Sequence, residues 1–463
     1  MKKTLLLLLL SLTFVTGSAY DYMINGLCYN LNEDGNTLTV VAERENRTPA
    51  YNSLSGDLVI PRMVLVDNRP CTVTAVGKDA FYGCAEITSI TIGDGVADVG
   101  NFAFKECKKV TSVTFGRNVK RIGYNCFGKC IALTSIAIPS PVAILEGETF
   151  SGCKALTSVT LPSTLTVLGQ GEFDDCSKLE TIIGGENVVR SGRGALSDTK
   201  WFYNQPNGIV YFGKVALGIR GDIPETITIK EGIVAVGDYF VCSDYVYHLN
   251  LPSSLKEIGN HGFEACRHLN NVTFPANLEV IGEMAFDAAM AFTEVDIPDK
   301  VTTIGGNAFS RSSAIEKLTI GKGVTKIDSY AFTSCTGIKH IYSYPDPDDV
   351  TLGRDVFSYG PSSDCVLHVK SSLLEKYQTA DQWKKFMPNI VGDLEDRPDV
   401  PAGKKGDVNG DNAVTAADIS CIVNVLAGLE AAETYQGRAD VNRDNAVTAA
   451  DISSVVNILA GLE

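Results

Sequence analysis

The sequence predicts an α+β repeat fold: a solenoid of short parallel strands, followed by a small all-α domain of paired loop–helix units. Three observations support this prediction. Each copy of a repeat ends in alternating apolar and small polar residues, and the last sixty residues contain one segment twice. The third is a 23-residue period, kept by Phe81, Phe104, Phe127, Phe150 and Phe173 and again by Phe263, Phe286, Phe309 and Phe332. A fixed period of this length is typical of a repeat protein whose copies stack on one another.

Residues 119–139 show the pattern of one copy. Leu133 to Ile138 alternates apolar with small polar residues, as expected for a half-buried strand, and Pro139 ends it. The segment from Ile122 to Cys130 is short and contains glycine, which favours a turn or an irregular helical segment that places Phe127 in the core. Because one copy cannot bury its own apolar face, neighbouring copies must stack, and their strands then pair in parallel.

The chain begins with a basic and then apolar segment that ends in small residues. This pattern predicts a secretory signal peptide over residues 1–19, cleaved near Ala19, and its apolar run is too short for a permanent membrane anchor. Residues 20–72 contain strand-like runs separated by turn residues. We interpret them as hairpins that cap the open N-terminal edge of the solenoid, which is expected over residues 73–392.

The period lapses over residues 184–232, where Trp201–Tyr203 and Ile209–Phe212 suggest an aromatic-rich hairpin inserted into the stack. Such an insertion either protrudes and binds a partner or forms an elongated repeat that packs its own aromatic residues. Residues 343–392 are expected to close the solenoid, with a last strand at 365–369 and a capping helix over 371–385. Residues 393–405 have the charge and proline content of a linker before a final domain at 406–463.

Charge and cysteine content narrow the possible functions. The formal net charge of −15 argues against nucleic acid and against anionic lipid as partners, and no second apolar run is long enough for membrane insertion. Cysteine recurs at one repeat position, where Ala289 and Ser312 also occur, so this position requires a small buried residue rather than a disulfide. The cysteines at this position are Cys84, Cys107, Cys130, Cys153, Cys176, Cys266 and Cys335.

The repeats resemble those of BspA-like leucine-rich repeat proteins, whose copies read close to I-G-x-x-A-F-x-x-C-x-x-L-x-x-I-x-I-P. The resemblance extends over roughly residues 26–392 and includes the Trp201–Gly213 insertion and the segment with Trp383. It implies a bacterial surface or secreted protein that binds host or neighbouring-cell proteins. It does not assign a ligand to particular residues.

The final domain contains two 12-residue loops with the ligand spacing of an EF-hand. Positions 1, 3, 5, 9 and 12 have oxygen-bearing side chains and position 7 offers a carbonyl, a set that suits calcium. Position 6 is asparagine rather than glycine, and position 12 is aspartate rather than glutamate. The candidate ligands are Asp407, Asn409, Asp411, Ala413, Thr415 and Asp418 in the first loop, and Asp440, Asn442, Asp444, Ala446, Thr448 and Asp451 in the second.

A loop followed by a helix, twice and without the leading helix of an EF-hand, resembles the dockerin module, here of type I. The resemblance implies two calcium ions, folding coupled to metal binding, and docking to a cohesin-type protein. The positions just before the last ligand help to choose the partner in that family; here they are Ala416, Ala417, Ala449 and Ala450. Because both halves are identical at these positions, either of two symmetry-related docking modes is expected.

Sequence motifs do not indicate an enzyme. No G-x-S-x-G or H-E-x-x-H motif occurs, and the five histidines form no catalytic grouping in the sequence. Two hypotheses remain for a secreted binding protein: an adhesin that the C-terminal module attaches to a cohesin-bearing surface, or a structural or carbohydrate-binding subunit of an extracellular polysaccharide-degrading assembly. A third keeps the module as a calcium-stabilised end piece. Strand faces rich in Thr, Ser and Lys favour protein over glycan.

Overall fold

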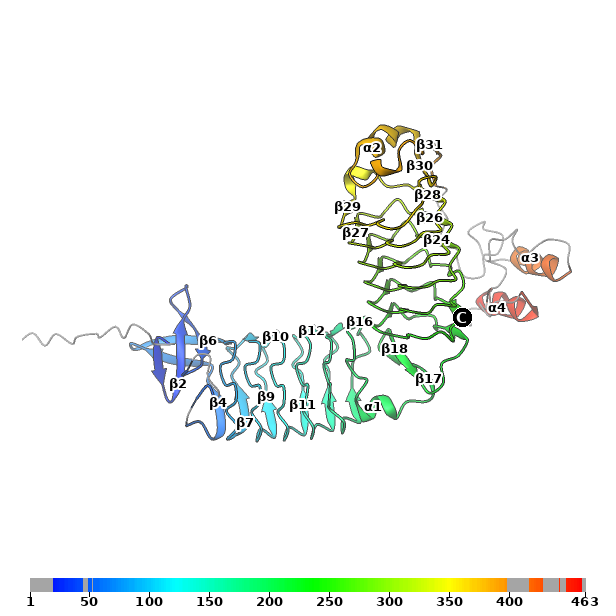
Figure 1. Ribbon diagram of the computed structural model, residues 1–463. Coiled ribbons are helices and arrows are strands. Elements are labelled where there is room, and N and C mark those ends of the chain that lie inside the picture. The colour runs from blue at the N-terminus through cyan, green and yellow to red at the C-terminus, as the bar shows by residue number, and fades with distance from the viewer. Residues whose placement is uncertain are drawn as a thin grey trace, which may run out of the picture. The chain divides into compact units, whose positions relative to one another are not determined.

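The computed structural model describes residues 20–44, 49–51, 53–397, 416–427, 441 and 447–459. The expected signal peptide and residues 398–405 of the expected linker lie outside these ranges. The chain divides into two compact units. The first comprises Met1–Asn187 and Gly194–Asn204, and the second comprises Val188–Arg193 and Gln205–Glu463. Within each unit, short strands are stacked turn upon turn along the two sides of a solenoid (Figure 1).

The N-terminal strands confirm the expected hairpins and extend both sides of the first solenoid unit. The first three strands pair antiparallel, and β5 forms a second hairpin with β6. In addition, β3 pairs in parallel with β6, and β4 pairs in parallel with β7, so the cap covers the edge of the repeat sheets. The strands are β1 (Tyr22–Ile24), β2 (Leu27–Leu31), β3 (Thr37–Val41), β4 (Gly56–Ile60), β5 (Met63–Val66), β6 (Arg69–Val76) and β7 (Ile87–Ile92).

The repeats of the first unit confirm the predicted parallel strands. Each coil gives one strand to a major-strand face and a two-residue strand to a minor-strand face, and paired residues such as Ile136 and Val159 are one repeat apart. The major-strand face continues from β7 with β9 (Ser112–Thr114), β11 (Ser135–Ala137), β13 (Ser158–Thr160) and β15 (Thr181–Ile183). The minor-strand face has β8 (Asp98–Val99), β10 (Arg121–Ile122), β12 (Ile144–Leu145) and β14 (Val167–Leu168).

The second unit has the same two faces. Its major-strand face contains β19 (Thr226–Thr228), β21 (His248–Asn250), β24 (Glu294–Asp296), β26 (Lys317–Ile320), β28 (His340–Ser343), β30 (Val366–Lys370) and β31 (Ile390–Leu394). Its minor-strand face contains β17 (Gly208–Phe212), β18 (Val215–Arg220), β20 (Ala235–Val236), β22 (Glu257–Ile258), β23 (Val280–Ile281), β25 (Thr303–Ile304), β27 (Lys326–Ile327) and β29 (Thr351–Leu352). The unit also includes β16 (Arg190–Ser191).

The expected insertion is only in part a hairpin. Strands β17 and β18 pair antiparallel as predicted, and β18 then joins the parallel minor-strand face through β20. The prediction that Trp201–Tyr203 belongs to this hairpin was wrong, because these residues form the short helix α1 (Lys200–Tyr203). Thr199 begins this helix: its hydroxyl accepts a hydrogen bond from the Phe202 N–H at 3.1 Å.

The C-terminal cap differs from the single helix predicted over 371–385. Helix α2 (Leu374–Thr379) ends early, and short 3-10 turns lie on either side of it at η2 (Ser371–Leu373) and η3 (Lys384–Phe386); a third, η1 (Pro347–Asp349), lies upstream. The break places Trp383 in the core, where its ring lies 5.3 Å from that of Phe357. Gln382, with φ of 61°, accepts a hydrogen bond from the Val356 N–H and donates one to the Gly353 carbonyl. Its side chain thus takes the hydrogen bonds that the backbone of a further coil would otherwise make. The last strand is β31 rather than the one at 365–369.

A ladder of stacked phenylalanines forms the core of each unit. Consecutive rings in the first unit, from Phe81 to Phe173, lie 5.2, 5.3, 5.7 and 5.6 Å apart. The second unit repeats this arrangement from Phe263 to Phe357. Ring separations in this range are favourable for offset aromatic stacking. The predicted burial of the repeat phenylalanines is therefore confirmed, and the ladder fixes the stacking of successive coils.

The repeated cysteine position is buried, as predicted, and its cysteines are free thiols in the structure. Cys130 Sγ donates a hydrogen bond to the Phe104 carbonyl at 3.3 Å, and Cys107, Cys153, Cys176 and Cys335 make the equivalent contact. Ser312 Oγ makes the same contact with the Phe286 carbonyl at 3.3 Å. The position therefore favours a small residue that can also donate a hydrogen bond, although Ala289 shows that small size alone is sufficient.

Candidate docking module and exposed faces of the solenoid

The duplicated segment forms two matching helices, α3 (Ala416–Leu426) and α4 (Ala449–Leu459). Each helix begins at the alanine pair named from the sequence and has an aspartate in its first turn, where the helix dipole favours a negative charge. The helices contact one another around a small core of Ile422, Val441 and Val455. The predicted helix pairing is therefore present in the described residues.

The final candidate ligand of each loop is fully buried. The side chains of Asp418 and Asp451 have no exposed surface. Asp451 Oδ2 accepts a hydrogen bond from the Thr448 N–H at 2.7 Å, which is one half of a capping box, and the Asp451 N–H donates to the Thr448 carbonyl. Buried carboxylates are usually paired with positive charge or coordinate a metal.

These buried carboxylates fit a calcium ion, which selects clusters of oxygen ligands. Asp418, Asp451 and Thr448 are the predicted ligands that the structure describes, and each lies at the start of a helix. The other predicted ligands lie outside the described residues: Asp407, Asn409, Asp411, Ala413, Thr415, Asp440, Asn442, Asp444 and Ala446. A calcium ion would supply positive charge beside each buried carboxylate and would tie each loop to its helix.

The two helices also expose matching apolar residues. Val423 and Leu426 on α3 are each 45% exposed, and Val456 and Leu459 on α4 are 46% and 47% exposed. The two pairs occupy equivalent positions in the duplicated sequence. Among the four alanines predicted to contact a partner, Ala449 is the one whose side chain is described, and it is exposed. Each helix therefore buries one apolar face and leaves a second one open.

The sequence reasoning did not identify this second apolar face. The signal was present, because α3 and α4 are apolar at more positions than a single buried stripe requires. A surface helix of a monomeric domain normally has polar residues opposite its core-facing stripe. Both halves depart from that rule in the same way, at Val423 and Leu426 of α3 and at Val456 and Leu459 of α4.

The major-strand face of the first unit carries small polar residues. Ser89 and Ser112 begin a series in which strands from successive coils present serine or threonine at equivalent positions, with Ala137 and Ile183 as exceptions. The corresponding face of the second unit is charged, and Lys317 pairs with Glu294 of the previous coil at 2.6 Å. These faces agree with the sequence interpretation of strands rich in Thr, Ser and Lys.

Two histidines and an aspartate lie in line on the charged face. His340 Nδ1 is 3.1 Å from His368 Nε2, and His368 Nδ1 is 2.9 Å from Asp393 Oδ2. The His368 ring also stacks on Tyr342, with ring centroids 4.4 Å apart. Within the described ranges, no three or more His, Cys, Asp or Glu side chains are arranged to hold a metal ion. The row is a polar surface feature rather than a metal centre.

A shallow groove of 420 Å³ runs along the minor-strand face of the second unit. Its floor is glycine backbone, including Gly282 and Gly305, and its polar lining includes Asn260, Glu283 and Asp328. The glycines are required here for packing, since a Cβ on Gly282 would lie 2.6 Å from the backbone of Gly259.

No described helix is long and apolar enough to cross a membrane.

One carboxyl group is buried inside the first unit. The Glu172 side chain has no exposed surface, and neither of its oxygens has a hydrogen-bond partner. Burial raises the pKa of Glu172 from 4.5 to about 8. Glu172 is therefore largely neutral at pH 7, which makes its burial tolerable.

The stacked 23-residue coils define the chain as a leucine-rich-repeat solenoid protein with a C-terminal loop–helix module. The model of the BspA type leucine rich repeat region matches residues 74–201 and 225–362 in six copies, which is more than half of the chain. The chain belongs to this BspA-type family. Residues 405–460 match the type I dockerin domain, a calcium-binding module whose partner is a cohesin.

Solved structures similar to this chain include several bacterial leucine-rich repeat proteins. A leucine rich cell surface protein from Faecalibacterium prausnitzii is 23% identical, with 70% of this chain and 94% of that chain covered and a TM-score of 0.37. A leucine-rich repeat protein from Bacteroides ovatus is 21% identical, with 76% and 100% covered and a TM-score of 0.29. The pneumococcal vaccine antigen PcpA is 16% identical, with 80% and 96% covered and a TM-score of 0.34. No curated protein matches the chain.

These matches define the function at a coarse level. Leucine-rich repeat and dockerin families are typically non-catalytic, and no enzyme family matches the chain. Both families are typically extracellular or surface-associated. The repeat fold and the dockerin domain together support a protein-interaction role that includes docking to a cohesin.

Proposed function

We propose that this chain is a secreted, non-catalytic binding protein in which two calcium ions order the C-terminal module for docking to a cohesin-type partner. The solenoid then presents its strand faces to a second protein, such as one on a host or neighbouring cell. The observation that carries the proposal is the matching set of exposed apolar positions on α3 and α4, two helices that each have a fully buried aspartate in the first turn.

The exposed residues give the docking surface its chemistry. Burying Val423 and Leu426, or Val456 and Leu459, against a partner would remove apolar surface that water now contacts, which is favourable at about 25 cal/mol per Å². The alanines at the start of each helix add small apolar contacts there. Because both helices carry the same residues, either one can face the partner, so the module has two equivalent docking modes.

The proposal places adhesion on the solenoid, because its strand faces suit protein better than glycan. In the first unit the exposed strand positions are mostly serine and threonine, with no aromatic row on the paired strands of that face. Stacking on aromatic rings is a common means of holding sugar rings, whereas hydroxyl and charged side chains pair readily with protein surfaces. A role as a carbohydrate-binding subunit of a polysaccharide-degrading assembly is therefore the weaker alternative.

Charge substitutions on the two helices test the docking proposal. We expect Val423→Asp or Val456→Asp alone to weaken cohesin binding by no more than about tenfold, because the other helix still offers an intact surface. The double variant should lose at least about a hundredfold, since both modes are then blocked. Binding is measured by surface plasmon resonance in calcium on immobilised type I cohesins.

A control separates loss of docking from loss of folding. Far-UV circular dichroism in calcium should show the same helix content for the double variant as for the wild type, because residues 423 and 456 point away from the small core. Ser453→Asp, at another exposed position of α4, provides a matched control for the added charge. Full binding by the double variant would refute this docking surface.

A further inference from the structure

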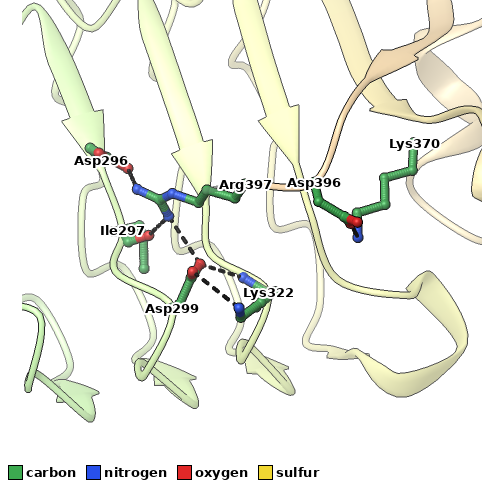
Figure 2. A network of polar contacts seen from close by, with 7 residues as sticks. All are labelled: Asp296, Ile297, Asp299, Lys322, Lys370, Asp396 and Arg397. Atoms are coloured by element: carbon green, nitrogen blue, oxygen red, sulfur yellow. Dashed lines mark hydrogen bonds and ion pairs between the residues drawn. The ribbon is translucent and has the colours of Figure 1, made fainter. Parts of the chain in front are cut away.

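The chain leaves the second unit along a defined path after its last strand. Strand β31 pairs in parallel with β30, and Leu394 is in register with Lys370. The next residues continue across the major-strand face: Asp396 forms an ion pair with Lys370, and Arg397 extends to the coil of β24 (Figure 2). Residues that read as the start of a linker are therefore attached to the solenoid.

Arg397 occupies a site formed by one turn. Its Nη1 donates to the Ile297 carbonyl at 2.8 Å and to Asp299 Oδ1 at 3.2 Å, and its Nη2 donates to Asp296. The guanidinium also lies over the ring of Tyr344, 5.7 Å from its centroid. Three acceptors and an aromatic face therefore surround one planar cation, as Figure 2 shows for the polar contacts.

The geometry suits arginine better than any other residue. The guanidinium is a rigid fork of donors that can bond two carboxylates and a carbonyl at once, whereas the lysine ammonium is a point charge on a flexible stem. Exposed ion pairs contribute little to stability. The Arg397 side chain, however, is only 14% exposed, and Asp299 is held in place by the Lys322 N–H at 3.0 Å.

We propose that the turn Asp296–Asp299 is a guanidinium-binding site for this chain's own Arg397, and that this anchor sets the point from which the linker carries the dockerin domain. The expected linker began at residue 393. With Arg397 held, eight residues of the expected linker follow the anchor, and a chain of eight residues spans at most about 29 Å when fully extended. A linker released after Leu394 would have eleven free residues and could span about 40 Å.

The anchor has a consequence for assembly. Effective concentration between linked binding sites depends on linker length and on where the linker starts. A docked partner would thus be held near the coil of β24 rather than at the capped end of the second unit. The anchor itself does not depend on the identity of the docking partner, so it can fail while the proposed function stands.

Proteolysis of the full chain in calcium tests the anchor directly. Glu395 lies within the attached segment, and its peptide bond should resist a glutamate-specific protease as long as Arg397 is held. We expect Arg397→Ala to speed cleavage after Glu395 about tenfold or more. Asp296→Asn should produce much of the same increase. Arg397→Lys should fall between wild type and Arg397→Ala, because it keeps the charge and loses the fork.

Matched controls identify the cause of any change. Arg354→Ala removes a well-exposed arginine that forms an ion pair with its neighbour Asp355, and it should leave cleavage at Glu395 unchanged. Small-angle X-ray scattering should show a larger mean dimension for Arg397→Ala than for Arg354→Ala. Equal cleavage and equal dimensions in the wild type and Arg397→Ala would overturn the proposal. An effect of Arg397→Ala without any effect of Asp296→Asn would overturn this site as the anchor.

Discussion

At the scale of the residue, Glu172 shows how the solenoid core controls ionisation. Its neighbours in the same repeat column are Thr149 and, in other coils, residues such as Ala103 and Cys126, so a carboxyl stands where the fold expects a small side chain. The Thr149 hydroxyl oxygen and both Glu172 oxygens are buried without hydrogen-bond partners. Removing a charge from water into such a site is costly, and Glu172 avoids that cost by remaining protonated.

The raised pKa of Glu172 predicts a loss of stability as pH rises from about 4.5 to about 8. Between its ordinary pKa of 4.5 and its folded pKa of about 8, the folded state binds more protons than the unfolded state. Stability therefore falls as pH rises through this window, by at most about 5 kcal/mol. We expect Glu172→Gln to remove most of that pH dependence in urea unfolding at pH 5.5 and pH 8.

The control for this prediction is Glu186→Gln, which changes an exposed glutamate of the same unit. It should leave the difference in the free energy of unfolding between pH 5.5 and pH 8 as it is in the wild type. If Glu172→Gln shows the full wild-type loss between pH 5.5 and pH 8, another group is responsible, and the interpretation of Glu172 is wrong.

At the scale of the element, close contact between coils limits which glycines can change. A Cβ on Gly305 would lie 2.4 Å from the backbone of Glu283, whereas a Cβ on the adjacent Gly306 would have 3.3 Å to its nearest neighbour. We expect Gly305→Ala to destabilise the second unit by about 2–4 kcal/mol, since the backbone must move. Gly306→Ala should cost less than about 1 kcal/mol.

This pair of variants is measured by thermal unfolding of the full chain in calcium. The two substitutions add the same methyl group at neighbouring positions, so helix or strand propensity cannot account for a large difference between them. An equal effect of both would show that the spacing between successive coils is not what requires glycine.

The repeating elements were predictable from sequence, and the irregular ones were not. A period of 23 residues repeats the same local signal in each coil, so the parallel strands and the phenylalanine ladder follow from the pattern around Phe127 alone. Helix α1 and the broken C-terminal cap occur once each. Their form depends on tertiary contacts, such as the Thr199 cap and the Trp383 packing, that no local propensity reveals.

The candidate site was likewise predictable from sequence only in part. Spacing predicted Asp418 and Asp451 as calcium ligands, because a 12-residue loop fixes which side chains can point inward. The structure shows both side chains to be buried, and their role as ligands stays a prediction. The apolar residues Val423 and Val456 were overlooked because an apolar residue on a helix is normally assigned to the core. Arg397 was assigned to a linker, because its partners Asp296 and Asp299 lie 101 and 98 residues earlier in the chain.

At the scale of the whole molecule, the chain combines two solenoid units of stacked coils with a C-terminal module whose fold we propose to depend on calcium. Strands and phenylalanine ladders form the core of each solenoid unit. In the described part of the module, Ile422, Val441 and Val455 form the buried apolar core. Because a calcium site of this kind does not preform in the unfolded chain, calcium binding is expected to supply much of the folding free energy of the module.

The central claim is calcium-dependent docking, and the most direct test is binding of the full chain to a panel of immobilised type I cohesins, with calcium and then with chelator. We expect at least one cohesin to retain the chain at micromolar concentration in calcium and to release it when the ion is removed. Retention that survives chelation would contradict the account. So would a module that gains helix on calcium addition yet binds no cohesin in the panel.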